Sequence, residues 1–545
     1  MKAHLLYRER DLDWKWILQA SAERESARGG RRHYRDQNFD PGKGLPWNAD
    51  AISADLSLGT IFDAMARGDD CVFEASRKVI LTAGTSDLET IRHRQGILRD
   101  CLSHPTVVRE LYAVAVEVGE KQKGNYLGVL ARYPDSVLRN AVEQMEVYLE
   151  FLQKLRRIAD SHGPRFASEG WTTFFAMLAR DLDDGYLALV RRQLEELKFR
   201  HGALLSAELG KANKGVGHIL HRVLPGHWSL RRWWTGLFED KGTVYRFDLH
   251  PRDEAGSQAL AALRNRGISL AANALGQSAD HVRDFWGMLR AELAFYVGCI
   301  NLAEELARRR MPACLPIPAA ADGQVLSFRE LYDVGLALSV DQPVIGNDAC
   351  ADGKNLVVIT GPNTGGKSTF LRSVGLAQLM MQSGMFVSAE AFSASLCDGL
   401  FTHFKREEDA GMESGKLDEE LGRMSDIVGR IAPHALLLLN ESFAATNERE
   451  GSEIGRQIIS ALLQRRIRVL CVTHMYELAH GFLESHQRTG LFLRAERKPD
   501  GARTFKLREG EPLPTSFGED LYNSIFGPAA SSSEAERPMA SAAAR

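Results

Sequence analysis

Residues with the chemistry of phosphate binding are concentrated in the stretch GPNTGGKS, which runs from Gly361 to Ser368. The stretch fits the pattern GxxxxGK[ST], in which glycines let backbone N–H groups fold around a phosphate. The lysine of this pattern reaches the terminal phosphates, and the hydroxyl that follows it is a ligand of Mg²⁺. A plain glycine-rich turn would not explain why Lys367 and Ser368 follow the last glycine, so the stretch predicts a site for a nucleotide and Mg²⁺. The predicted binding residues are Gly361, Pro362, Asn363, Thr364, Gly365, Gly366, Lys367, Ser368 and Thr369.

A second group of polar residues follows the apolar run LLLL, which ends at Asn440 and Glu441. Nucleotide hydrolases usually place an aspartate that supports Mg²⁺ before the glutamate that orients water. Asn440 can accept a hydrogen bond from a metal-bound water but adds no negative charge, so Mg²⁺ should bind more weakly. A strand capped by two polar residues is the simpler alternative. The phosphate loop upstream favours a modified but working site, with Ser368, Asn440 and Glu441 at the metal.

A third candidate is His474, which follows the run RVLCVT. A strand over Arg468–Thr473 delivers this imidazole to the same edge of a parallel sheet, where it can sense a γ-phosphate. A lone histidine is usually structural, but its place at the end of a core strand favours function. Lys367, Glu441 and His474 are therefore the predicted catalytic residues.

A fourth candidate is the start of a helix with an apolar stripe at Leu417, Leu421, Met424, Val428 and Ile431. Ser414, Gly415 and Lys416 stand at its N-terminus, where backbone N–H groups attract anions. These three residues could contact a nucleotide, including one held by another subunit. An ordinary solvated helix start would need no such ligand, and both interpretations remain open.

The elements that must position these residues change in kind along the chain. Before Pro312 the pattern is helical, with long apolar stripes over 135–159 and 171–199. Ser278 and Asp280 can cap a helix that continues to Ile300. After Pro312, strands over 355–360, 435–439 and 468–473 alternate with helices such as 370–382, as in a parallel α/β domain.

Composition sets limits on the class of protein. The chain has 545 residues, 44% hydrophobic and 26% charged, which is typical of a soluble globular protein. The net charge of −3 excludes a basic field over the whole molecule, so nucleic-acid contacts would need a local patch. Seven scattered cysteines indicate reduced thiols. No secretory signal or apolar run of membrane-spanning length is present, so we expect a cytoplasmic protein without membrane contact.

The four candidate groups, in this order, resemble the ATPase domain of the MutS family of DNA mismatch-repair proteins. The similarity is strong over TGPNTGGKSTFLRSVGLAQLMMQSGMFVSAE and continues through Asn440–Glu441 and Thr473–His474 to PTSFGEDLY, from Pro514. It is moderate in the helical half, where LETIRHRQGILRDCL is similar to the start of the MutS core domain.

The resemblance, which covers about residues 50–527, and the polar composition of the two ends together imply a multidomain fold with four segments. A polar N-terminal extension (1–48), expected to be flexible, precedes a mainly α-helical core, lever and clamp domain (49–311). An α/β P-loop ATPase domain of the ABC type (312–527) and a disordered tail (528–545) follow. By resemblance the protein binds ATP and Mg²⁺ and forms a homodimer with composite sites. Ser414, Gly415 and Lys416 then approach the partner subunit's nucleotide, and His474 reads the γ-phosphate.

Departures from the family pattern limit this expectation. The chain begins close to the core domain, and the Phe-x-Glu mismatch wedge of the family has no counterpart in this sequence. We therefore expect a form without the N-terminal mismatch-recognition domain. The family's Asp-Glu pair is Asn440–Glu441 here. ATP-gated binding to some DNA structure, in repair or recombination, is therefore the expected function, with DNA-dependent ATP hydrolysis. The alternatives are an ATP-holding DNA clamp with little hydrolysis, and an ABC-type ATPase that acts on a partner other than DNA.

Basic and aromatic residues alternate between Lys211 and Trp234. Basic side chains neutralise phosphates and aromatic rings pack on sugars or bases, and the family's DNA clamp lies in this part of the chain. A solvated face with buried tryptophans is the competing explanation, which the usual burial of tryptophan favours. The candidate DNA contacts are Lys211, Lys214, Arg222, Arg231 and Arg232.

Overall fold

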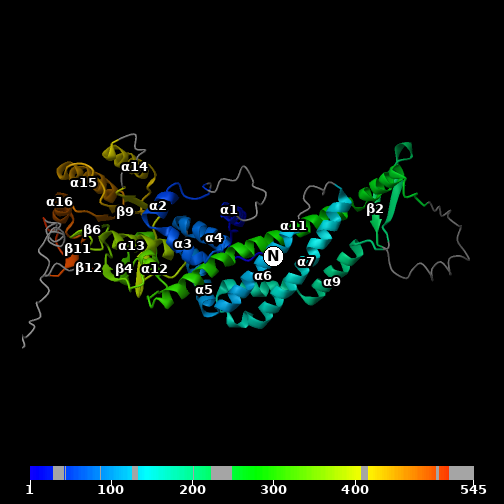
Figure 1. The fold of residues 1–545 in the computed structure, drawn as a ribbon, viewed down its shortest axis with the longest axis horizontal. Helices are drawn as coiled ribbons and strands as arrows, with labels where there is room; N and C mark the ends of the chain where they lie inside the picture. Colours follow the sequence, from blue (N-terminus) through cyan, green and yellow to red (C-terminus); the bar gives the residue numbers. More distant parts are fainter. Residues whose placement is uncertain are drawn as a thin grey trace, which may run out of the picture. The chain divides into compact units, whose positions relative to one another are not determined.

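The computed structural model of the protein describes residues 1–28, 42, 44–85, 87–124, 133–200, 202–222, 248–406, 415–498 and 503–514. The chain forms two compact units. The first comprises Met1–Lys43, Met65–Lys78 and Arg92–Asn301, and the second comprises Gly44–Ala64, Val79–Ile91 and Leu302–Arg545. The first is mainly helical and the second is α/β, so the predicted order of fold classes along the chain is confirmed (Figure 1).

Long amphipathic helices make up most of the first unit. They are α1 (Trp14–Ala27), α4 (Asp70–Leu81), α5 (Leu88–Ser103), α6 (Pro105–Gly124), α7 (Pro134–His162), α8 (Glu169–Asp181), α9 (Asp184–Leu197) and α11 (Glu254–Arg308). The short 3-10 helix η2 (Gly163–Arg165) follows α7. Leu138 and Val142 of α7, Leu194 of α9 and Ile268 of α11 share one apolar cluster. Among the described residues, no helix is long and apolar enough to cross a membrane.

The helix boundaries differ from the predicted ones at two places. The stripe over 171–199 is divided into α8 and α9, because Asp183 caps α9 by accepting from the backbone N–H of Tyr186. The predicted helix start at Ser278 is wrong, since α11 runs through it without a break. The Ser278 hydroxyl donates to the carbonyl of Ala274, the bond that a serine inside a helix makes.

Residues 1–28 are not the flexible extension that their polar composition suggested. Leu5 and Leu6 are fully buried in the helical unit, and α1 buries Trp16 and Ile17. The backbone of Leu5 is bound at both ends: its N–H donates to Glu292 at 2.7 Å, and its carbonyl accepts from the Tyr296 hydroxyl at 2.6 Å. A few apolar side chains with dedicated partners were enough to order a segment that is polar on average.

An antiparallel hairpin interrupts the helices of the first unit. Strand β1 (Leu204–Leu209) pairs with β2 (Gly215–His221), and η3 (Lys211–Asn213) joins them. Apolar side chains on the hairpin, including those of Leu209 and Ile219, are exposed. The hairpin thus presents Lys211 and Lys214 beside exposed apolar residues.

The second unit is built around a six-stranded sheet in the order β12-β11-β6-β10-β9-β8. Its strands are β6 (Leu356–Thr360), β8 (Leu400–Phe404), β9 (Leu436–Asn440), β10 (Arg468–Val472), β11 (Gly490–Arg497) and β12 (Arg503–Glu509). All neighbours are parallel except β11 and β12. The three predicted core strands are therefore confirmed, and they are adjacent: β6, β10 and β9.

A smaller sheet in the order β3-β7-β4-β5 completes the β-structure of this unit. It consists of β3 (Ile317–Ala319), β7 (Ala391–Ser395), β4 (Leu326–Leu331) and β5 (Asn347–Cys350). The helices of the unit are α2 (Ala49–Asp55), α3 (Leu58–Ala66), η1 (Ala83–Thr85), η4 (Ala321–Gly323), α12 (Val334–Ser339), α13 (Lys367–Gln382), α14 (Lys416–Arg430), α15 (Glu448–Gln464) and α16 (Tyr476–His486).

Helices cover both faces of the six-stranded sheet. Helices α14, α15 and α16 bury Met424, Ile459 and Phe482 in one cluster with Leu437 and Leu439 of β9. Helix α13 packs on the opposite face, where a Cβ atom at Gly375 would lie 2.6 Å from Leu438. Glycine is therefore required for the close approach of α13, the helix that begins at the phosphate loop.

Candidate nucleotide-binding site

The candidate phosphate loop lies between the fully buried strand β6 and helix α13. Its backbone enters the left-handed region at Gly361 (φ 117°), Thr364 (φ 59°) and Gly366 (φ 86°). A Cβ atom at Gly361 would lie 2.9 Å from the backbone nitrogen of Ala495, so a side chain would not fit. The loop needs its glycines for the positive φ angles and for the close approach to Ala495. It leads directly into the N-terminus of α13.

Lys367 is the first residue of α13, and its ammonium group is folded into the loop. Its Nζ donates to the carbonyls of Gly361 and Pro362, each at 2.9 Å, and the residue is 5% exposed. Burial lowers the pKa of Lys367, the charge of Glu441 opposes this shift, and Arg503 adds to it. The lysine is thus a desolvated cation that already faces a carboxylate and a second cation.

Ser368 and Asn440 contact each other directly. The Ser368 hydroxyl donates to Asn440 Oδ1 at 2.8 Å, which joins the start of α13 to the end of β9. With Glu441 next to them, the three predicted metal residues offer hydroxyl, amide and carboxylate oxygens, the ligand types that Mg²⁺ prefers. The donor set fits Mg²⁺, but Glu441 supplies its only negative charge.

Glu441 follows β9 in the left-handed backbone region, with φ of 54°. Its backbone N–H donates to the carbonyl of Val472 on β10 at 2.9 Å, and the residue lines the same cavity as the loop. His474 follows β10 and is exposed, and it is not among the residues that line the cavity. The sequence placed both residues at the correct sheet edge, and the structure brings Glu441 to the loop but leaves His474 outside the cavity wall.

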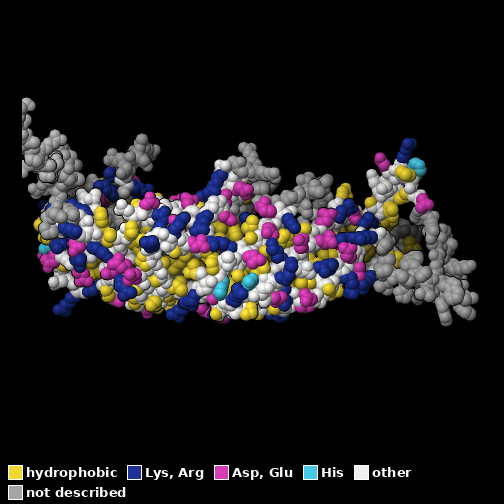
Figure 2. Space-filling view, turned by 60° about the horizontal axis from the view of Figure 1, so that its bottom comes forward, with side chains coloured by type: hydrophobic (Ala, Val, Ile, Leu, Met, Phe, Trp, Pro, Cys, Tyr) yellow, Lys and Arg dark blue, Asp and Glu magenta, His cyan; other side chains and the backbone are white. Residues whose placement is uncertain are grey.

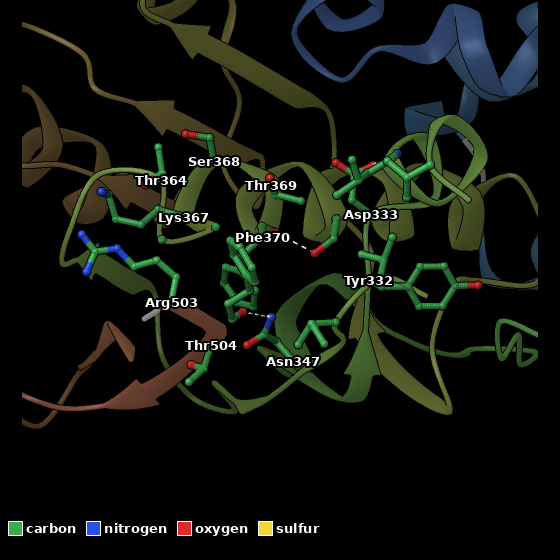
Figure 3. Close-up of a pocket in the computed structure, with 18 of the residues that line it drawn as sticks. Tyr332, Asp333, Asn347, Thr364, Lys367, Ser368, Thr369, Phe370, Arg503 and Thr504 are labelled. Carbon is green, nitrogen blue, oxygen red and sulfur yellow. Dashed lines mark hydrogen bonds between the residues drawn. The ribbon is translucent and has the colours of Figure 1, made fainter. Parts of the chain in front are cut away.

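A cavity of about 970 Å³ opens beside the loop. The phosphate-loop residues Asn363–Thr369 form one wall and Glu441 closes one side. Figure 3 shows Thr364, Lys367 and Arg503 on one side of this space, with Tyr332 and Asp333 on the other. The volume falls within the range of roughly 300–1,000 Å³ that small-molecule sites occupy.

Sequence reasoning missed the far walls of the cavity, which come from 331–347 and from β12. Asn347 holds β12 in place: its Nδ2 donates to the carbonyl of Phe505 at 3.2 Å, the dashed line at Asn347 in Figure 3. Its Oδ1 accepts from the backbone N–H of Leu507 at 2.7 Å. Asp333 caps α12 and pairs with Arg372 at 2.8 Å. No spacing signal in the sequence connects these residues to the loop.

Gly415 and Lys416 mark the N-terminus of α14, as predicted, with Gly415 as the capping residue. Neither residue lines the cavity. The third member of this predicted group, Ser414, lies outside the described residues. The predicted apolar stripe of α14 is correct at Met424 but not at Val428, which is exposed while Ile427 is buried.

Three of the candidate DNA contacts, Lys211, Lys214 and Arg222, lie on or next to the β1–β2 hairpin of the first unit. Lys211, Lys214 and Arg222 are exposed, and Arg222 forms an ion pair with Glu196, which offsets part of its charge. Arg231 and Arg232 lie outside the described residues. On the face drawn in Figure 2, basic and acidic side chains are interspersed over the described residues.

Comparison with known proteins connects these two units to one family. Residues 86–309 match the family model of the MutS2 N-terminal domain, and residues 357–539 match MutS domain V. The chain belongs to the MutS family. The first match covers most of the helical unit, and the second begins in β6 and includes the loop, Asn440, Glu441 and His474.

Curated MutS relatives match parts of the chain. The chain is 33% identical over 143 residues to MutS protein homolog 4 of Mus musculus, which is 26% of this chain and 15% of that relative. It is 27% identical over 324 residues to Endonuclease MutS2 of Streptococcus pneumoniae (strain Hungary19A-6), which is 57% of this chain and 39% of that relative. The chain thus spans less than half the length of these MutS proteins.

Proposed function

We propose that this protein is a DNA-binding ATPase of the MutS type, in which ATP binding and hydrolysis gate a dimeric clamp used in DNA repair or recombination. The observation that carries the ATPase part is the convergence of Lys367, Ser368 and Glu441 on one cavity, at the ends of β6 and β9, the two strands that flank β10. The membership of both units in the MutS family carries the DNA part.

In this proposal the phosphates of ATP lie along the loop Gly361–Thr369, against the N-terminus of α13. The apolar walls at Val344, Ile345 and Phe505 accommodate the base, since they line the same cavity. Nucleotide entry releases Lys367 Nζ from the carbonyls of Gly361 and Pro362 toward the β- and γ-phosphates. The internal hydrogen bonds therefore keep the buried cation satisfied before the nucleotide arrives.

Ser368, Asn440 and Glu441 hold Mg²⁺ in this arrangement. A Mg²⁺ ion held there would neutralise the charge that develops on the phosphate oxygens. Glu441 orients the attacking water and accepts a proton from it. His474 senses the γ-phosphate. Gly415 and Lys416 approach the nucleotide of the partner subunit. The domains proposed for this function are the helical part 49–311 and the P-loop ATPase part 312–527.

DNA contact is proposed for the β1–β2 hairpin, through Lys211 and Lys214 and, more weakly, Arg222. Each phosphate contact of this type makes binding depend on salt. The mixed charge of the face drawn in Figure 2 and the net charge of −3 support local rather than extended contact. The DNA structures to be compared are therefore branched, mismatched and plain duplexes.

The test is steady-state ATP turnover of the full chain, with and without branched, mismatched and plain duplex DNA, beside Lys367→Ala and Glu441→Ala. We expect DNA-stimulated turnover that both substitutions abolish, with ATP binding lost in Lys367→Ala and kept in Glu441→Ala. Turnover that survives in Glu441→Ala would contradict the assignment of the base.

Asn440 favours one alternative, an ATP-holding DNA clamp with little hydrolysis, because the metal site lacks the usual second carboxylate. That protein would bind ATP tightly and would turn it over no faster than Glu441→Ala. The same assay therefore separates the two proposals.

A further inference from the structure

The turn that follows β9 has an unusual backbone. Glu441 and Phe443 both lie in the left-handed region, with φ of 54° and 63°, on either side of Ser442. Residues other than glycine are rare there, and such conformations persist only where surrounding contacts fix them. The contacts of Ser442 therefore bear on the position of Glu441.

The turn is anchored to the strands on both sides of β9. On one side, the N–H of Glu441 donates to Val472 of β10. On the other side, the Ser442 hydroxyl lies 2.7 Å from the carbonyl oxygen and 2.8 Å from the ring Nδ1 of His403, a residue of β8. Ser442 is buried, so its hydroxyl is shielded from solvent.

The contact of the second ring nitrogen of His403, Nε2, shows which ring nitrogen carries the proton. Nε2 lies 3.0 Å from the backbone carbonyl of Glu420 in α14, and a carbonyl can only accept, so Nε2 carries a proton. Burial, followed by the charge of Arg423, lowers the pKa of His403 to about 4, and Arg406 acts in the same direction. The ring is therefore neutral near pH 7 and Nδ1 carries no proton, so Nδ1 and the carbonyl oxygen of His403 are both acceptors for the single proton of the Ser442 hydroxyl.

Helix α14 meets the turn a second time through Phe443. The Phe443 ring stacks on that of His403, with centroids 5.6 Å apart and planes at 22°. Burial raises the pKa of the Glu420 carboxyl, while the backbone of Phe443 and the charge of Arg423 lower it. Glu420 thus contacts His403 with its backbone carbonyl, and Phe443 shares an apolar cluster with Met424 and Ile427 of α14.

We propose that His403 and Ser442 are positioning residues, which fix the turn that bears Glu441 and tie that turn to α14. Neither residue is among those that line the cavity. Through His403 and Ser442, the orientation of the Glu441 side chain depends on the position of α14, the helix that begins with Gly415 and Lys416. This role rests on the proposed ATPase function.

The test compares Ser442→Ala with Ser383→Ala in the full chain. Ser383 is a matched control because it is buried in the same unit and its hydroxyl donates to the carbonyl of Leu379 at 2.7 Å, at the end of α13 remote from the loop. We expect Ser442→Ala to lower kcat by on the order of 10- to 100-fold, the loss typical of a misplaced catalytic group. The affinity for a non-hydrolysable ATP analogue should not change, and Ser383→Ala should keep the wild-type kcat.

Three results would overturn the role. Equal kcat in Ser442→Ala and Ser383→Ala would show that the hydroxyl does not position Glu441. A parallel loss of analogue affinity and kcat would indicate general damage to the site. Wild-type protein without turnover would refute the proposed function and this role with it. If Ser442→Ala does not fold, Ser442→Cys keeps the size, weakens the donor and is judged by the same criteria.

Discussion

At the scale of single residues, Asn440 is the feature that distinguishes this site. The amide oxygen accepts the Ser368 hydroxyl at 2.8 Å, so the contact between the loop and the end of β9 is made. What the amide cannot supply is charge, and hydrogen bonds to ionised groups are about twice as strong as neutral ones. We therefore expect Asn440 to keep the geometry of the site and to lower its attraction for Mg²⁺.

Asn440→Asp should lower the Mg²⁺ concentration that gives half-maximal ATP turnover, by on the order of tenfold, since one charged contact contributes roughly 1–2 kcal/mol. A Mg²⁺ titration of ATP hydrolysis measures this. Asn447→Asp is the control, because it adds the same charge at the exposed cap of α15, where Asp accepts from the Glu450 N–H as well as Asn does. An equal shift in both variants would mean that net charge, rather than the contact with Ser368, attracts the metal.

At the scale of elements, the N-terminal segment is held by groups inside the helical unit. Besides the contacts of Leu5, Arg94 donates to the carbonyl of Leu6 at 2.9 Å. Burial raises the pKa of Glu292 to about 8, and Asp11 acts in the same direction, while the N–H groups of Leu5 and Leu6 and the charge of Arg94 oppose the shift. A polar segment is thus ordered by two buried leucines and a largely protonated carboxyl group.

The raised pKa of Glu292 predicts a pH dependence of stability. The folded state keeps the proton up to about pH 8, whereas the unfolded chain releases it near 4.5, the ordinary pKa of a glutamate. The folded state therefore binds more protons between these values, and the free energy of unfolding falls as pH rises through this window, by on the order of 1 kcal/mol per unit.

Glu292→Gln should remove this dependence, because the amide oxygen still accepts from Leu5 but carries no charge at any pH. Urea unfolding at pH 5 and pH 8, followed by tryptophan fluorescence, measures the free energy of unfolding. The variant should gain stability relative to the wild type as pH is raised. A difference between variant and wild type that is the same at both pH values would contradict the assignment.

At the scale of the whole molecule, the predicted partner of the site is a second copy of the chain. Gly415 and Lys416 begin α14 but do not line the cavity of their own subunit. The resemblance to MutS proteins assigns such residues to the nucleotide of the other subunit. ATP that is bound and not hydrolysed should therefore hold two copies together.

Glu441→Gln with ATP and Mg²⁺ should elute as a dimer whose dissociation is slower than that of the wild type, because the base that ends the ATP-bound state is lost. Size-exclusion chromatography with light scattering measures the mass. Lys367→Ala under the same conditions should show no ATP-induced increase. A mass that does not depend on ATP in either variant would refute an ATP-gated dimer.

The sequence by itself determined the local elements of the site. Spacing and residue type were sufficient to place the loop 361–366, the helix α13 and the strands β6, β9 and β10, because an unbroken apolar run followed by glycines and Lys-Ser admits few alternatives. The parallel arrangement of these strands brought Glu441 to the loop without further information.

Only the tertiary structure decided which distant residues complete the site and which apparent loops are ordered. The contact of Asn347 with β12, beside the loop, joins residues 160 positions apart. The contact of His403 with Ser442, in the turn after β9, joins residues 39 positions apart. Contacts over such separations leave no local pattern in the sequence. The burial of Leu5 and Leu6 likewise depends on Glu292 and Tyr296, almost 300 residues away in sequence. Periodicity reports only on neighbours within a few turns or pleats, whereas these contacts depend on how the elements pack.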